Sequence, residues 1–115
     1  MMATMDQIRE GVMRYAEKEI VPGLEGIKQV LVGAGLEFYL RKKLPQLVGA
    51  LGIAEDDGQV DVNLLEEVLV KRVNAMPNGM ELKLNLNPMN KADVDVFRIR
   101  GSDVQKLAAF IRGGE

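Results

Sequence analysis

The sequence predicts an α+β fold, in which N-terminal helices pack with a two-stranded antiparallel hairpin and a C-terminal helix. Apolar residues recur at the helical period over most of the first 76 residues. Between residues 80 and 100 the period changes to two, which is typical of strands with one buried face. A capping pattern then precedes a last helical stripe. With 115 residues, the chain is expected to form a single domain over residues 1–115.

The first helix is expected to begin at Thr4, with Gln7 completing a capping box. Pro22 and Gly23 follow its charged last turns, so we expect the helix to end before them. The apolar stripe of this helix contains Ile8, Val12 and Tyr15.

The second helix, residues 26–44, is apolar on two nearly opposite faces. One face contains Ile27, Val30, Leu31, Ala34 and Phe38, and the other contains Val32, Leu36 and Leu40. Such a helix is either the central helix of the domain or a contact with a second chain, and a helix lying on a membrane surface is a third alternative. If the helix self-associates, we predict that Val32, Leu36 and Leu40 form the interface.

Two glycines inside this helix, Gly33 and Gly35, each cost about 1 kcal/mol of helix propensity relative to Ala. We expect close approach of another backbone to compensate for them. Arg41, Lys42 and Lys43 are expected to end the helix, where cations suit the helix dipole, with an anion site as the alternative. Pro45 is expected to begin a separate short helix that ends at Gly52.

The acidic segment Glu55–Asp61 raises the question of a calcium loop. If Gly58 takes the sixth position of such a loop, the first and twelfth positions fall on Ile53 and Leu64, which offer no carboxylate. We therefore predict a tight turn at Gly58, followed by a helix over residues 62–76 that is capped by Asp61. A weak calcium site of another type remains an alternative.

Residues 80–86 and 94–100 are predicted to form the hairpin. The alternation in the first strand implies that Leu82, Leu84 and Leu86 either pack on helices or join a neighbour's sheet. The adjacent Val96 and Phe97 favour a bulge in the second strand. Ser102, with Gln105 three residues later, is expected to cap the last helix rather than act as a nucleophile.

The inventory of reactive side chains points away from catalysis. The chain has no His and no Cys, one Ser and one Thr, which excludes a catalytic triad within the chain and argues against the usual zinc, copper and haem sites. We expect no enzyme activity, no cofactor and no metal. Carboxylate chemistry with a hard metal at Asp56, Asp57 and Asp61 is the remaining catalytic alternative.

Charge and hydropathy limit the partners. A net charge of −2 makes nucleic acid an unlikely partner, and no apolar run approaches the roughly 20 residues of a membrane span. The N-terminus lacks the pattern of a signal peptide, and the absence of Cys suits a reducing compartment, so we expect a cytoplasmic location.

Three segments carry a resemblance: EKEIVPGLEG at Glu17–Gly26, GIAEDDGQVDVNLL at Gly52–Leu65 and RGSDVQKLAAFIRG at Arg100–Gly113. In this order they resemble small proteins of unknown function encoded in bacterial prophages. The resemblance implies a phage-derived context, such as virion structure or assembly, in the cytoplasm of the bacterial host. It assigns no functional residue.

These observations favour a non-enzymatic, self-associating structural or assembly protein. The alternative is a small monomeric module that binds or regulates a protein partner.

Overall fold

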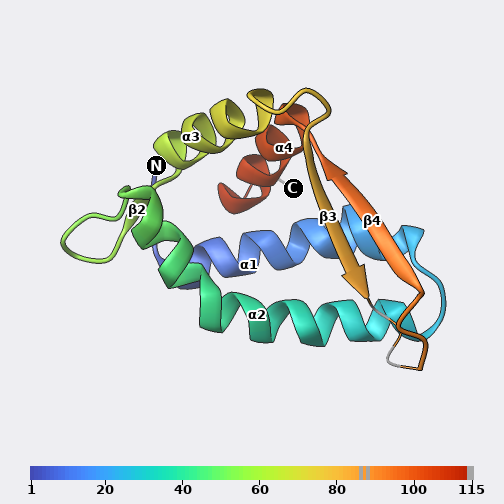
Figure 1. Cartoon of the computed structure of the whole chain (residues 1–115). Coiled ribbons are helices and arrows are strands. Elements are labelled where there is room, and N and C mark those ends of the chain that lie inside the picture. The colour runs from blue at the N-terminus through green and yellow to red at the C-terminus, as the bar shows by residue number, and fades with distance from the viewer. Residues whose placement is uncertain (86, 88, 114–115) are drawn as a thin grey trace.

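The fold is α+β, as the sequence predicts. The computed structural model describes residues 1–85, 87 and 89–113, with the side chains of residues 82 and 84 excepted (Figure 1). Along the chain the elements are β1 (Met2–Ala3), α1 (Met5–Tyr15), the π-helix η1 (Ala16–Ile20), the 3-10 helix η2 (Val21–Gly23), α2 (Ile27–Leu51), β2 (Val60–Asp61), α3 (Val62–Asn74), β3 (Met80–Asn85), β4 (Val94–Ile99) and α4 (Gly101–Ile111).

The start of α1 confirms the predicted capping box. The Gln7 backbone N–H donates to the Thr4 hydroxyl at 3.2 Å, and the Thr4 N–H donates to the Gln7 side chain at 2.8 Å. The predicted end of this helix before Pro22 is confirmed, because α1 ends at Tyr15 and its π-helical continuation η1 ends at Ile20, before the separate 3-10 turn η2. Pro22 is tolerated there because it lies in the first turn of η2, where its missing N–H costs no helical hydrogen bond.

The prediction of two helices between residues 26 and 51 is wrong, because α2 is one helix with Pro45 inside it. Proline removes a helical hydrogen bond and clashes with the preceding turn, which normally ends or bends a helix. Figure 1 shows that α2 bends within its green second half. Leu44 and Val48 on either side of the bend are both buried, so packing holds the helix together across the proline. Gly52, at φ 69°, ends it as predicted.

The main core lies at the end of the molecule where β1 pairs with β2. Met2 pairs with Asp61 and Ala3 with Val60, and the Val62 N–H donates to the Met1 carbonyl at 2.8 Å. The sequence analysis missed this pairing, because strands of two residues show no period. Six elements and the connection between α2 and β2 supply the core: Ala3, Ile8, Leu44, Val48, Ile53, Val60, Val62, Leu65, Ala108 and Ile111.

The predicted hairpin is present as β3 and β4. Its antiparallel register runs without interruption from Met80 opposite Ile99 to Asn85 opposite Val94, so the predicted bulge is wrong. Val96 simply points outward and is 54% exposed. The prediction of a buried face made of Leu82, Leu84 and Leu86 lies outside the described side chains.

The two last predicted caps have different outcomes. Asp61 caps α3 as predicted, since its carboxylate accepts from the backbone N–H groups of Asn63 and Leu64. Ser102 is not the cap of α4 but its second residue. The Asp103 carboxylate instead accepts from the Arg100 N–H at 2.8 Å, and a carboxylate also suits the positive end of the helix dipole.

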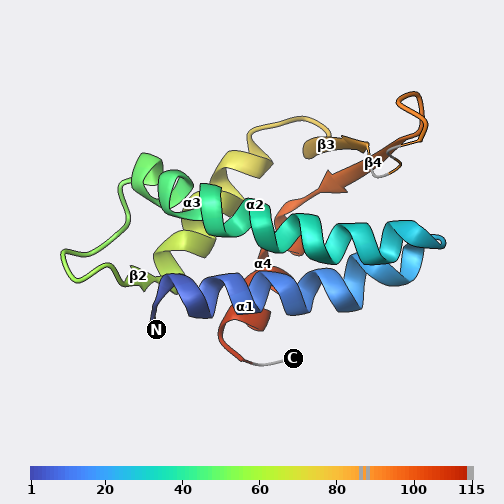
Figure 2. The same cartoon turned by 90° about the horizontal axis from the view of Figure 1, so that it is seen from below.

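The molecule is elongated. Its extents are 43 × 31 × 26 Å, and its radius of gyration of 14.5 Å exceeds the roughly 13 Å of a compact chain of this length. Helices α1 and α2 run side by side along the long direction, and the hairpin lies at the end away from β1 and β2 (Figures 1 and 2). The first half of α2 thus extends beyond the main core.

Candidate self-association surface

The predicted interface of α2 lies inside the chain. Val32 and Leu40 are 7% and 6% exposed, and Leu36 is half-buried. The sequence analysis identified the two apolar faces of this helix correctly, but it assigned the contact with a second chain to the face that this fold covers. In this structure Val32, Leu36 and Leu40 form the inward face.

The opposite face of α2 is exposed. Ile27 is 63%, Val30 71% and Phe38 70% exposed. In Figure 2, which views the molecule from below, α2 lies in front of the other elements and none of the described elements crosses it. We call this surface the free face of α2 and define it by the residues Ile27, Val30, Leu31, Ala34 and Phe38.

The glycines of α2 are not explained by packing inside the chain. Among the described residues, nothing lies within 4 Å of a Cβ placed on Gly33 or Gly35. The expected close approach of another backbone is therefore absent from this part of the chain, and the cost of the two glycines to helix stability has no internal compensation.

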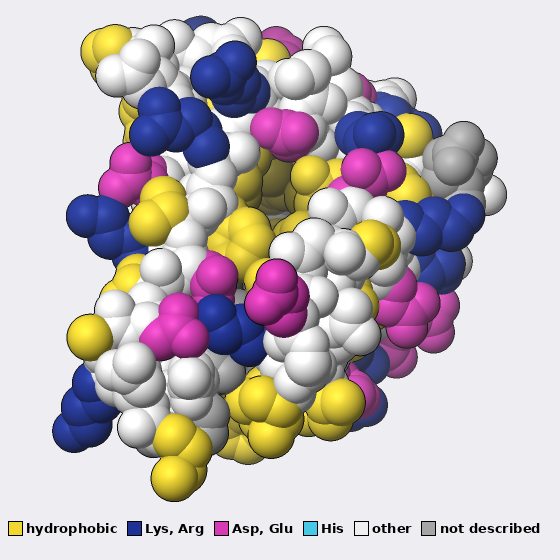
Figure 3. Space-filling model, turned by 90° about the vertical axis from the view of Figure 1, so that its right-hand side faces the viewer, with side chains coloured by type: hydrophobic (Ala, Val, Ile, Leu, Met, Phe, Trp, Pro, Cys, Tyr) yellow, Lys and Arg dark blue, Asp and Glu magenta, His cyan; other side chains and the backbone are white. Residues whose placement is uncertain are grey.

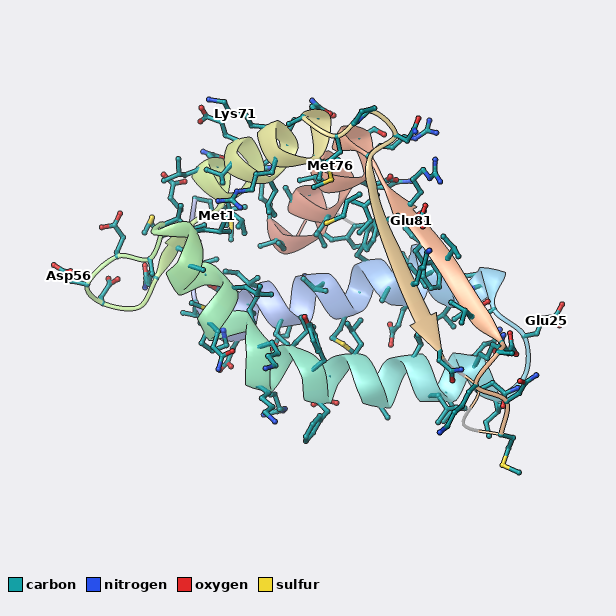
Figure 4. All side chains as sticks on the ribbon, viewed as in Figure 1. Met1, Glu25, Asp56, Lys71, Met76 and Glu81 are labelled. Carbon is teal, nitrogen blue, oxygen red and sulfur yellow. The ribbon has the colours of Figure 1, made fainter. Side chains whose placement is uncertain are left out.

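The charges along α2 are unevenly distributed. Arg41 and Lys42 are exposed near the middle of the helix, and the Arg41 guanidinium lies 3.0 Å from the Glu37 carboxylate. Because α2 continues to Leu51, these cations do not end the helix, and the predicted interaction with its C-terminal dipole is wrong. Glu25 precedes the N-terminal end of α2 and points into solvent (Figure 4).

A pair of aspartates attaches the hairpin to the first turn of α2. The Lys28 Nζ lies 3.0 Å from an Asp93 oxygen and 2.9 Å from an Asp95 oxygen, and Asn87 donates to the other Asp93 oxygen at 3.2 Å. We call Lys28, Asp93 and Asp95 the latch. Hydrogen bonds to Asp95 and Asp93 raise the pKa of Lys28, and hydrogen bonds from Lys28 and Asn87 lower the pKa of Asp93.

The acidic segment forms the predicted turn. The Gly58 N–H donates to the Glu55 carbonyl at 2.9 Å, and Gly58 has φ 80°. Asp57 accepts from the Gln59 N–H, Asp61 caps α3, and Asp56 points away from the loop into solvent (Figure 4). Within the described residues, no three His, Cys, Asp or Glu side chains gather as metal ligands.

Two shallow pockets in the described part of the chain contain charged side chains. One, of about 400 Å³, lies at the base of the hairpin between Asn74, Asn78 and Arg100. The other, of about 390 Å³, lies between α1 and α2 and brings Arg9, Arg14 and Arg41 near Glu10, Glu17 and Glu37. Opposite charges balance in this second pocket, and Arg14 is occupied by a hydrogen bond to the Phe110 carbonyl at 2.9 Å.

Comparison of the chain with protein-family models, curated proteins and solved structures finds no match. None of the helices in the described part of the chain combines the length and the apolar character needed to cross a membrane. Because its large apolar side chains are exposed, the free face of α2 is the surface from which we argue a function.

Proposed function

We propose that this chain is a non-enzymatic structural or assembly protein that self-associates through the free face of α2. The resemblance noted above supports a phage-derived role in the cytoplasm of a bacterial host. The chemistry of the side chains agrees with a role that depends on contact, because the one Thr and the one Ser both lie at helix starts and the chain contains no His and no Cys.

One observation carries the proposal. Three large apolar side chains on one stripe of α2 are each more than 60% exposed, while the opposite stripe is buried within the same chain. Single exposed apolar residues are ordinary, but a contiguous apolar surface usually marks an interaction site. Because the fold already uses the other face of α2, the exposed face is not needed for the core.

A second candidate function is a monomeric module that binds a protein partner, and the hairpin favours it. Val94 and Val96 are 45% and 54% exposed on the outer side of β4. Within the described residues the sheet of β3 and β4 has two strands, so each strand presents an outer edge to which an extended segment of another protein could pair.

Light scattering after size exclusion, at two protein concentrations, separates these candidates. We expect the wild-type chain to show twice the monomer mass of 12.7 kDa at the higher concentration. Phe38→Glu should stay monomeric, because its charge would be desolvated in the contact, while circular dichroism should show an unchanged helical fold. Val96→Glu is the matched control, since it adds the same charge at an exposed valine outside α2.

The outcomes are distinct. A wild-type monomer at both concentrations would reject self-association and favour the monomeric module. A dimer that Val96→Glu disrupts and Phe38→Glu does not would move the contact from α2 to the hairpin.

A further inference from the structure

We infer that the free face of α2 binds the free face of a second α2 in antiparallel orientation. The two-fold axis lies in the contact, at the level along the helix midway between residues 32 and 33. This inference rests on the proposed self-association. It specifies the partner surface, the orientation and the residues that meet.

The spacing of the free face suits a second helix. Ile27, Leu31, Ala34 and Phe38 follow one another at intervals of four, three and four, which is the spacing of a coiled-coil seam. The seam covers twelve residues, about 18 Å of helix. Helices with such seams pack at a shallow crossing angle of about 20°, so the contact continues along the whole stripe.

Side-chain size favours the antiparallel orientation. About this two-fold axis, Ile27 meets Phe38 of the partner subunit, and Leu31 meets Ala34 of the partner subunit. Each layer then contains at least one large side chain, so in neither layer do two small residues face each other. A parallel pair in register would instead set Ala34 against Ala34 and leave a gap, and unfilled space in a contact loses dispersion energy.

Charge favours the same orientation. Around the N-terminal end of α2, the carboxylates of Glu25, Asp93 and Asp95 outnumber the cations of Lys28 and Lys91. Beyond the middle of the helix, the basic residues 41–43 outnumber Glu37. Antiparallel packing brings the basic part of each α2 toward the acidic end of the other, and it also opposes the two helix dipoles. Parallel packing would place the two basic segments side by side.

One of the two glycines inside α2 borders the free face. At about 100° per residue, Gly35 lies next to Leu31 around the helix, whereas Gly33 lies on the side of Leu40. No group of the described fold packs within 4 Å of a Cβ placed on Gly35. Small residues let two helix backbones approach, so a second α2 can come close at this edge of the free face.

Cysteine cross-linking tests the orientation directly, because the chain has no Cys of its own. Ile27→Cys and Phe38→Cys are both at exposed positions, so neither should disturb the fold. One of the two variants carries a tag that changes its size, and equal amounts of the two are mixed under mild oxidation. We expect the mixed disulfide to exceed the proportion that random pairing gives. Val96→Cys mixed with Phe38→Cys is the control, in which no such excess should form.

Failure of this inference can be told apart from failure of the proposed function. If the wild type is a dimer and each variant forms mainly disulfides with itself, the orientation is wrong and the self-association stands. If light scattering shows only monomer, both fall. A dimer whose mixed disulfides match random pairing would also overturn the proposed orientation. Leu31→Cys mixed with Ala34→Cys repeats the test in the next layer.

Discussion

Gly11 is a residue at which the backbones of α1 and α4 come close. A Cβ at this position would lie 2.6 Å from the Ile111 Cα and 2.9 Å from its backbone nitrogen. The sequence analysis assigned close approach to Gly33 and Gly35, where the described chain leaves open space. All three glycines lie within helices, so the sequence alone offers no way to tell which of them touches a second backbone.

We predict that Gly11→Ala lowers the free energy of unfolding by about 1–3 kcal/mol, because the new methyl group would push against the backbone of α4. Gly49→Ala is the control within α2. No described atom lies within 4 Å of its added Cβ, so it should raise stability by up to about 1 kcal/mol through helix propensity. Urea denaturation of both variants measures the difference, and a stabilising Gly11→Ala would contradict the close contact.

The hairpin makes few backbone contacts with the rest of the described fold. Its strands pack mainly on each other, whereas α1, α3 and α4 pack closely together. Seen from the hairpin end, hydrophobic side chains line a hollow in the surface (Figure 3). The latch of Lys28, Asp93 and Asp95 is therefore an important tie between the hairpin and α2.

We predict that Lys28→Gln weakens this tie and increases hydrogen exchange of the β3 and β4 amides while the amides of α1 and α4 keep their protection. The Asp95 oxygen near Lys28 is buried, so its charge would lose its partner. Lys83→Gln is the control, since among the described residues Lys83 pairs with Glu81 of the same strand at 3.4 Å. Equal exchange in both variants would show that the latch does not hold the hairpin.

The latch should also depend on pH. Because the pKa of Asp93 is lowered in the folded chain, its contribution is complete above about pH 4 and declines as the pH falls through the lowered pKa. Because the pKa of Lys28 is raised, its contribution persists up to about pH 10.4 and is lost above the raised pKa. Amide chemical shifts of β4 should therefore be constant between these limits and change outside them.

At the scale of the whole molecule, two phenylalanines show how the fold divides its apolar residues. Phe110 is 1% exposed and packs edge-on against Tyr15 with ring centroids 5.7 Å apart. Burial, followed by the nearby Asp103 and Glu19, raises the pKa of the Tyr15 phenol. Phe38, on the free face of α2, is 70% exposed. The first belongs to the interior, and we assign the second to a contact between chains.

We predict that Phe110→Ala lowers the free energy of unfolding by about 3–5 kcal/mol, because it leaves a cavity between α1 and α4. Phe38→Ala should change the stability of the monomer by less than about 0.5 kcal/mol. Chemical denaturation at low protein concentration makes the comparison without the dimer. A large loss for Phe38→Ala under these conditions would show that the free face of α2 packs inside the chain after all.

The parts of this protein that depend on near neighbours in sequence could be predicted. The Thr4 and Asp61 caps, the turn at Gly58 and the end of α2 at Gly52 each involve hydrogen bonds or backbone angles within a few residues. The hairpin follows from its period of two. The two apolar faces of α2 and the absence of His and Cys were also evident from the sequence alone.

The tertiary structure decided what depends on distant residues. Pairing of Ala3 with Val60 joins segments far apart in sequence, and burial of Leu44 and Val48 carries α2 past Pro45. The choice between the two faces of α2 has the same origin. Both faces are apolar enough to be buried, and the packing of the other helices against Val32 and Leu40 left Ile27, Val30 and Phe38 outside. Periodicity shows that a face can be buried, but only the position of its neighbours determines that it is.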